Sequence, residues 1–378
     1  MKKVILDTNI YYQFPKRKNR FFHAIKKMAD KKLLELYIPY IVEHENKTQQ
    51  VVKLEKEIEK VVAGLEKIKK FDISFGFEKN IESAIKTLSD QKIKMTNSVK
   101  KNFDLWVEEI SAVKIPLSIE QTNKAFEAYF SGTLPFKKIK SRDDIPDGFI
   151  AEAVKQICQN SEKDDSSKIY FISNDSTMLK SFSNQKNIVV YKSLNDFFDT
   201  EEINKELREI DIIDNSNVIH EVIFQSKTDI EHIISNKIGE EIIGCDIIDD
   251  SIPCDNNSAR ISSYWEAENI TLDWHSLKYY GDGQFGCNFS LQIDVLAEFY
   301  IYKSEYFYME MEIDVTELND YVFEAEDDFS IDVSGVILIP VNSEDHFKED
   351  IYIVEEEIVI DEIQEINLIR ESEKEGNY

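Results

Sequence analysis

The sequence predicts an α/β fold for the first half of the chain, with a parallel sheet flanked by helices, followed by an acidic, β-rich α+β domain. Short apolar runs alternate with helical periodicities over residues 1–200, which is typical of a parallel sheet covered on both faces. After residue 200, apolar and acidic residues alternate along several runs, as they do in half-exposed antiparallel strands. The balance of charge changes at the same place.

Charge divides the 378 residues into two unequal parts. Residues 1–200 contain 35 Lys and Arg against 28 Asp and Glu, while residues 201–378 contain 10 against 45, so the net charges are +7 and −35. A chain of this length exceeds one compact core, and we expect domains at 1–200 and 201–378. The first domain can approach a polyanion and the second repels one. The acidic domain is expected to restrain the basic one, to bind a regulatory protein or to self-associate, with solubility alone as the alternative.

The elements of the first half are expected in the following order. Strands are predicted at residues 4–6, 34–39, 113–117, 168–173 and 188–191, where the apolar runs are short and bounded by polar residues. Helices are predicted at 18–32, 41–70, 119–130 and 147–160 from apolar residues at helical spacing. Residues 79–110 are expected to form two more helices, which with the long helix make a helical insertion at about 45–110.

The second half is expected to contain one helix and several half-exposed strands. The helix is predicted at about 228–238, and the strands at 290–295, 299–302, 308–315, 331–339 and 351–354. Turn-rich segments at 256–258 and 281–286 separate some of these strands.

Cysteine usage and apolar segments exclude several classes of protein. None of the four cysteines forms a Cys-x-x-Cys pair, so neither a zinc knuckle nor a disulfide framework is predicted. The first apolar run meets Asp7 too early for a signal peptide. No segment approaches the roughly 18 apolar residues of a membrane helix. We therefore expect a cytoplasmic protein without a membrane partner.

Four carboxylates follow apolar runs in the first half, at Asp7, Glu45, Asp147 and Asp175. The carboxyl ends of parallel strands meet at one edge of a sheet, where ligand sites form. Carboxylates that converge there repel each other unless a divalent cation holds them. The pattern therefore favours metal-assisted phosphodiester cleavage, and the alternative is that each acid only caps or stabilises the start of a helix.

The segments that carry these acids resemble the PIN-domain nuclease superfamily over about residues 1–195. The matching segments are Leu6–Asn9, Ile38–Glu45, Asp144–Ala151 and Phe171–Asp175, in that order. The resemblance implies an endoribonuclease that uses one or two Mg²⁺ or Mn²⁺ ions held by the four acids. It further implies RNA as the partner, and proteins of this superfamily often occur in toxin, RNA-processing and defence systems.

Neighbouring residues are expected to support the four acids. Thr8 and Asn9 can orient the carboxylate of Asp7 or cap the next turn. The same supporting role beside the acids is expected for Ser173, Asn174 and Asp143.

Glu43 competes with Glu45 for the role of the second acid, because residues two apart on a helix face different sides. The family pattern favours Glu45, and we expect Glu43 to point away from the site.

A basic loop precedes Asp147 and is a candidate for binding RNA phosphates through Lys137, Lys138, Lys140 and Arg142. The alternative is a solvated basic face. A solvated face is favoured for the second basic cluster, at 16–20. Aromatic residues such as Tyr12 either stack on unpaired bases or pack in the core, and core packing is favoured.

Two other functions remain open from the sequence. One is an RNA-binding scaffold with a PIN-like fold that does not cleave, although the presence of all four acids argues against it. The other is a DNA-directed, flap-type nuclease, because related metal sites cut both polymers.

Overall fold

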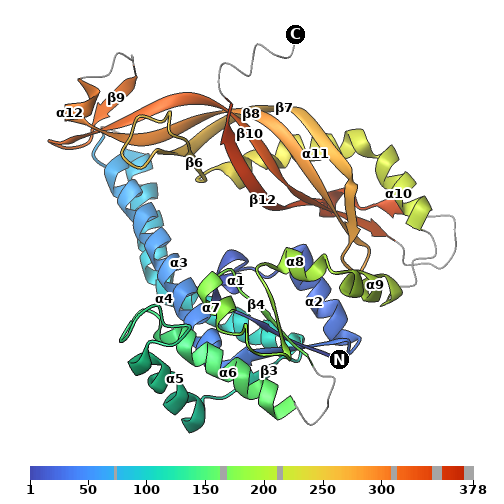
Figure 1. Ribbon diagram of the computed structural model, residues 1–378. Helices are drawn as coiled ribbons and strands as arrows, with labels where there is room; N and C mark the ends of the chain where they lie inside the picture. Colours follow the sequence, from blue (N-terminus) through green and yellow to red (C-terminus); the bar gives the residue numbers. More distant parts are fainter. Residues whose placement is uncertain (72–74, 162–167, 211–215, 308–312, 343–350, 370–378) are drawn as a thin grey trace. The chain divides into compact units, whose positions relative to one another are not determined.

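The computed structural model describes residues 1–71, 75–161, 168–210, 216–307, 313–342 and 351–369 (Figure 1). The chain forms two compact units, Met1–Glu206 and Leu207–Tyr378, and each has its own sheet. Within the described ranges, no helix combines the length and the apolar character needed to cross a membrane.

The first unit is built on a parallel sheet. Its five described strands have the order β3 (Val113–Ile115), β2 (Leu34–Pro39), β1 (Lys2–Leu6), β4 (Ile169–Ile172) and β5 (Ile188–Tyr191). The residues of β4 and the last three of β1 are all buried, because helices lie on both sides of the sheet (Figure 1). These runs have no polar face to present to water. The predicted α/β fold class is thus confirmed.

The described helices of this unit connect and flank the strands. They are α1 (Thr8–Gln13), α2 (Arg20–Asp30), α3 (Tyr40–Ile68), α4 (Phe75–Glu109), α5 (Ile119–Ser131), α6 (Ile145–Ser161), α7 (Ser176–Lys180), α8 (Leu194–Phe198) and α9 (Glu201–Ile210). The sequence pattern did not reveal α1, α7, α8 and α9, three of which are shorter than two turns and give too few residues for a periodic signal.

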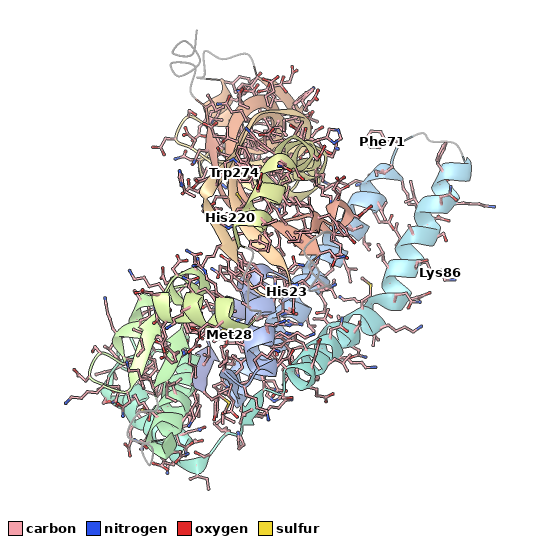
Figure 2. All side chains as sticks on the ribbon, turned by 90° about the vertical axis from the view of Figure 1, so that its right-hand side faces the viewer. His23, Met28, Phe71, Lys86, His220 and Trp274 are labelled. Atoms are coloured by element: carbon pink, nitrogen blue, oxygen red, sulfur yellow. The ribbon has the colours of Figure 1, made fainter. Side chains whose placement is uncertain are left out.

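Helices α3 and α4 pack side by side as a long arm. The prediction of two helices within residues 79–110 is wrong, because α4 is one continuous helix of 35 residues. Ser89, a residue type that is disfavoured in helix interiors, donates its hydroxyl to the carbonyl of Ile85 at 2.9 Å and so stays within the helix. Phe71 is 71% exposed and lies at the far end of the arm, while Lys86 projects from α4 (Figure 2).

An aromatic cluster anchors the base of the arm to the sheet domain. The rings of Tyr11, Phe22, Phe103 and Trp106 meet with centroids 5.4–6.0 Å apart. The guanidinium of Arg17 lies 5.0 Å from the ring centre of Phe103 and is buried. Arg20 of the same cluster is 2% exposed, so two side chains of the basic cluster at 16–20 are internal, whereas a solvated face was expected.

The second unit is a β-rich domain around an antiparallel sheet, as predicted. Its seven described strands are β6 (Asp246–Ile248), β7 (Ser258–Tyr279), β8 (Gln284–Tyr302), β9 (Asp314–Glu317), β10 (Val322–Asn342), β11 (Tyr352–Ile353) and β12 (Val359–Leu368). The described helical elements are α10 (Ser216–Gln225), α11 (Lys227–Ile242), α12 (Lys303–Tyr306) and the 3-10 turn η1 (Glu355–Glu357).

Several strand predictions in this unit need correction. The predicted strands 290–295 and 299–302 are parts of the single strand β8, and β7 and β12 were not predicted. Residues 308–312 of the predicted strand 308–315 lie outside the described residues.

Helix α11 supplies much of the core of the second unit. Ile230, Ile234, Ile238 and Ile242 recur every fourth residue and are fully buried. Between them, Gly239 lies against Tyr264 of β7, where an added Cβ atom would approach the ring to 1.9 Å. The close contact between α11 and β7 therefore requires a residue without a side chain at this position.

Candidate active site

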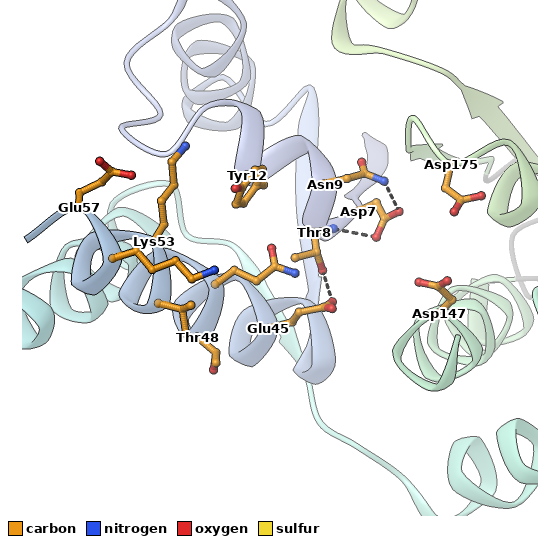
Figure 3. Close-up of a pocket in the computed structure, with 13 residues that line it drawn as sticks. Asp7, Thr8, Asn9, Tyr12, Glu45, Thr48, Lys53, Glu57, Asp147 and Asp175 are labelled. Atoms are coloured by element: carbon orange, nitrogen blue, oxygen red, sulfur yellow. Dashed lines mark hydrogen bonds between the residues drawn. The ribbon is translucent and has the colours of Figure 1, made fainter. Parts of the chain in front are cut away.

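A cavity of about 710 Å³ opens at the edge of the sheet where β1 and β4 end. All four predicted acids line it, together with other polar residues: Asp7, Thr8, Asn9, Tyr12, Glu45, Thr48, Gln49, Val52, Lys53, Lys56, Glu57, Asp147 and Asp175. In Figure 3 the four carboxylates lie around one end of this space, and Tyr12, Lys53 and Glu57 lie toward the other. The site therefore combines residues from elements that are distant in the sequence.

Asp7 is the most constrained of the four acids. It follows β1 directly, is 4% exposed, and caps α1 by accepting the Thr8 N–H at 2.7 Å through Oδ1. Its Oδ2 accepts hydrogen bonds from the Asn9 amide at 2.8 Å and from the Ser173 hydroxyl at 2.5 Å. The capping role and the position in the cavity thus coexist, and three donors fix the carboxylate.

Ser173 and Asn9 connect Asp7 to Asp175. The Ser173 hydroxyl oxygen accepts the Asp175 N–H at 3.1 Å, and the Asn9 amide donates to the same oxygen at 3.0 Å. Asn9 also accepts the N–H of Asn174 at 3.3 Å. Asp175 caps α7 by accepting the N–H groups of Thr177 and Met178 through Oδ1. The ends of β1 and β4 are therefore tied together by Ser173, which bonds both acids, and by Asn9, which bonds Asp7 and the Asn174 N–H.

The structure brings Glu45, and not Glu43, to the cavity. Thr8 donates its hydroxyl to Glu45 Oε2 at 2.7 Å, which joins α1 to α3. Glu43 is 8% exposed and accepts from Lys47 at 2.7 Å and from Lys114 at 2.9 Å. These two ammonium groups lower the pKa of Glu43 despite its burial. Glu43 thus forms an ion pair with lysines that do not line the cavity, and it points away as expected.

Asp147 enters the cavity from the first turn of α6. It lies two residues beyond the first residue of that helix, so the simple capping alternative does not describe it. Its neighbour Asp144 is buried and accepts the Lys137 N–H at 3.0 Å. Asp143 is exposed and does not line the cavity. Of the three aspartates in this segment, only Asp147 reaches the site.

The crowding of carboxylates changes their acidity. Burial, opposed by the hydrogen bonds from Ser173 and Thr8 and increased by the charges of Glu45 and Asp175, raises the pKa of Asp7 from its usual 3.8 to about 6. Burial, followed by the charges of Asp7, Asp175, Glu45 and Asp144, raises the pKa of Asp147 to about 7. Mutual repulsion of this kind is relieved by a cation.

The donor set matches a hard divalent cation in its chemistry. Carboxylate oxygens are the ligands that Mg²⁺ and Mn²⁺ prefer, and the raised pKa values of Asp7 and Asp147 mark an excess of negative charge. In the described part of the chain, no three His, Cys, Asp or Glu side chains are close enough to enclose an ion. Binding of an ion therefore requires the carboxylates to turn toward it.

The basic loop before Asp147 does not line the cavity. Lys137, Lys138, Lys140 and Arg142 are all exposed, and none of them is among the lining residues. The cations that do line it are Lys53 and Lys56 of α3, which sequence reasoning missed. The sequence contained a signal for these two lysines, because they lie 8 and 11 residues after Glu45 on a predicted helix, and this spacing places them on the same side of the helix as Glu45.

The comparisons with known proteins agree with the fold of the first unit. Residues 4–178 match the family model described as a PIN domain, while no curated protein and no solved structure was found to match the chain. PIN domains are in general metal-dependent nucleases that act on nucleic acids and use Mg²⁺ or Mn²⁺. The match includes all four cavity acids and the strands that position them. Residues 4–178 of this chain are therefore a PIN domain.

Proposed function

We propose that the protein is a metal-dependent endoribonuclease and that Asp7, Glu45, Asp147 and Asp175 hold one or two Mg²⁺ or Mn²⁺ ions. The observation that supports this most directly is that four carboxylates from separate elements line one cavity, where burial and the neighbouring charges raise the pKa of Asp7 and of Asp147. Such an ion makes hydroxide available near neutral pH and offsets negative charge on the phosphate in the transition state.

The protein's own residues have distinct roles in this proposal. Asp7 is oriented by Thr8, Asn9 and Ser173, so the carboxylate of this proposed metal ligand is already fixed before substrate binds. Glu45 is held by the Thr8 hydroxyl. Asp147 comes from α6, across the cavity in Figure 3, and brings the fourth charge. Preorganised ligands of this kind reduce the reorganisation needed when a phosphodiester enters.

The proposal assigns regulation to the second unit and the reaction to the first. The −35 charge of residues 201–378 opposes nucleic acid, so this part is proposed to restrain the nuclease or to hold a protein partner. A cytoplasmic location and a role in a toxin or defence system belong to the same proposal.

Incubation with labelled pools of RNA and DNA tests the reaction. RNA should be cut internally in the presence of Mn²⁺ or Mg²⁺ and remain intact in EDTA. Asp7→Asn and Asp175→Asn should each lower the rate by at least roughly a hundredfold, because loss of a residue that only supports a metal ligand already costs roughly 10–100-fold. Asp143→Asn is the matched control, because Asp143 is exposed and outside the cavity, and it should retain the wild-type rate.

Three outcomes would contradict the proposal in different ways. Full cleavage in EDTA would refute a metal-dependent reaction. Cleavage of DNA in preference to RNA would favour the DNA-directed nuclease. Metal-independent RNA binding without any cleavage would favour the scaffold that does not cut.

A further inference from the structure

The cavity extends well beyond the carboxylates, along one face of α3. Its lining residues on this helix are Glu45, Thr48, Gln49, Val52, Lys53, Lys56 and Glu57, which recur at intervals of three and four residues and so share a face. At a rise of about 1.5 Å per residue, Lys53 lies about 12 Å and Lys56 about 16 Å along the axis from Glu45. A polymer whose reacting bond lies at the acids would therefore have neighbouring groups at the lysines.

Tyr12 forms the opposite wall of this extension. It lies on α1, four residues after Thr8 and hence on the same helix face, and it is 44% exposed. The ammonium of Lys53 lies over its ring, 4.9 Å from the centre, and both side chains line the cavity. The preceding residue of the helix, Tyr11, is fully buried, so the two tyrosines face different sides of α1, and Tyr12 is the one that lines the cavity.

Lys53 and Lys56 share this part of the cavity with one acid, Glu57. Within the ranges that the structure describes, neither Lys53 nor Lys56 forms an ion pair. By contrast, Glu57 at the end of the cavity accepts a hydrogen bond from Lys60 at 2.9 Å. The two exposed ammonium groups are thus available to a phosphate, while the negative charge next to them is already paired.

We propose that Tyr12, Lys53 and Lys56 form a subsite for an unpaired nucleotide of the cleaved strand, with its base stacked on Tyr12 and adjoining phosphates at the two lysines. This inference rests on the proposed function, since it takes the cleaved strand to be the one that the carboxylates engage. An aromatic face beside a lysine recognises the flat surface of a base and its backbone. In a duplex both surfaces of a base are covered by its neighbours, so the subsite selects single strands.

Binding measured in EDTA tests the subsite without any cleavage. The full chain is titrated into a labelled single-stranded RNA, the same RNA as a perfect duplex, and a single-stranded DNA of the same sequence. Tyr12→Ala should weaken binding of both single strands by roughly tenfold or more, with little change for the duplex. Tyr12→Trp, which keeps an aromatic face, should restore it. Thermal unfolding of each variant checks that the fold is unchanged.

The lysines are tested through the salt dependence of binding. Each lost phosphate contact reduces the slope of log K against log salt by roughly 0.7 for single strands, so the Lys53→Ala/Lys56→Ala double variant should lose roughly 1.4. Lys94→Ala is the matched control, because Lys94 is an exposed residue of α4 that does not line the cavity. It removes one positive charge and should leave the slope unchanged.

The outcomes separate this inference from the proposed function. The subsite would be overturned if Tyr12→Ala and the wild type bound single strands equally well. It would also be overturned if Tyr12→Ala lost the same affinity for the single strand and for the duplex, or if the wild type bound no RNA. If cleavage fails while binding still depends on Tyr12, the subsite stands and the nuclease proposal falls. If cleavage is normal in Tyr12→Ala and its binding is unchanged, the nuclease proposal stands and the subsite falls.

Discussion

Replacement of Asp147 by Asn should stabilise the metal-free protein at neutral and alkaline pH. In the folded protein, burial and the nearby carboxylates raise the pKa of Asp147 from 3.8 to about 7. A shift of about three units corresponds to at most about 4 kcal/mol of unfavourable charging. Because Asp147 is only partly buried, solvent screening reduces this to about 1–2 kcal/mol. For a domain of about 200 residues this is a rise in Tm of about 3–6 °C.

The sign of the pH dependence follows from the proton balance. Between pH 3.8 and about 7 the unfolded state has released this proton while the folded state still binds it, so wild-type stability falls as the pH rises through this range. The stabilising effect of Asp147→Asn should therefore be close to zero at pH 4, grow toward pH 7 and remain constant above it. Calorimetry in EDTA at pH 4, 6 and 8 measures this dependence.

Divalent metal should reverse the ranking of the two proteins. Mn²⁺ that binds the folded state raises Tm, and the rise should be larger for the wild type, which keeps all four acids. Asp143→Asn again serves as the control and should follow the wild type at every pH. A variant that melts with the wild type at pH 8 in EDTA, or a gap that is widest at pH 4, would refute the electrostatic account of this site.

Three further predictions concern other parts of the chain. Ser173→Ala removes a buried hydroxyl that donates to Asp7, so it should lower the free energy of unfolding in urea by about 1–3 kcal/mol and lower the cleavage rate. An unchanged urea midpoint would argue against the hydrogen-bond network around Asp7. Gly239→Ala places a Cβ atom 1.9 Å from the ring of Tyr264, so the second unit should unfold at least about 1–3 kcal/mol more easily while the first unit keeps its own transition. A fragment of residues 1–210, which retains the ion pair between Lys2 in β1 and Glu202 at 2.9 Å, should cut RNA faster than the full chain if the acidic unit restrains it. That gap should shrink as salt is raised, and a folded fragment of equal activity at every salt concentration would rule out restraint.

The local sequence pattern was sufficient to predict most of the secondary structure that forms the first unit. The strands at 34–39 and 188–191 have the predicted ends, and the other three differ by a few residues, because buried parallel strands are short apolar runs between polar residues. The positions of Asp7 and Asp175 after their strands followed from the same pattern. Parallel pairing then brings those two ends to one edge of the sheet.

Which side chain of a helix or loop enters the cavity depended on packing. Glu43 and Glu45 both lie near the start of α3, and Lys47 of the same helix together with Lys114 of β3 holds Glu43 away from the cavity. In the same way, Asp144 is retained by the Lys137 N–H of the preceding loop, so the basic loop supports α6 and does not line the cavity. In both cases a contact with a residue outside the helix contributed, Lys114 for α3 and Lys137 for the start of α6, and the periodicity of the helix itself does not contain it.

The sequence by itself determined that this chain has a basic α/β part with carboxylates at its strand ends and an acidic β-rich part, because periodicity, apolar runs and charge are properties of each segment alone. Only the tertiary structure decided that Lys53 and Lys56, and not the loop at 137–142, accompany the acids, and that Tyr12 is half-exposed beside them. The physical reason is that helical spacing defines a face, while the packing of α1 against α3 decides what that face meets.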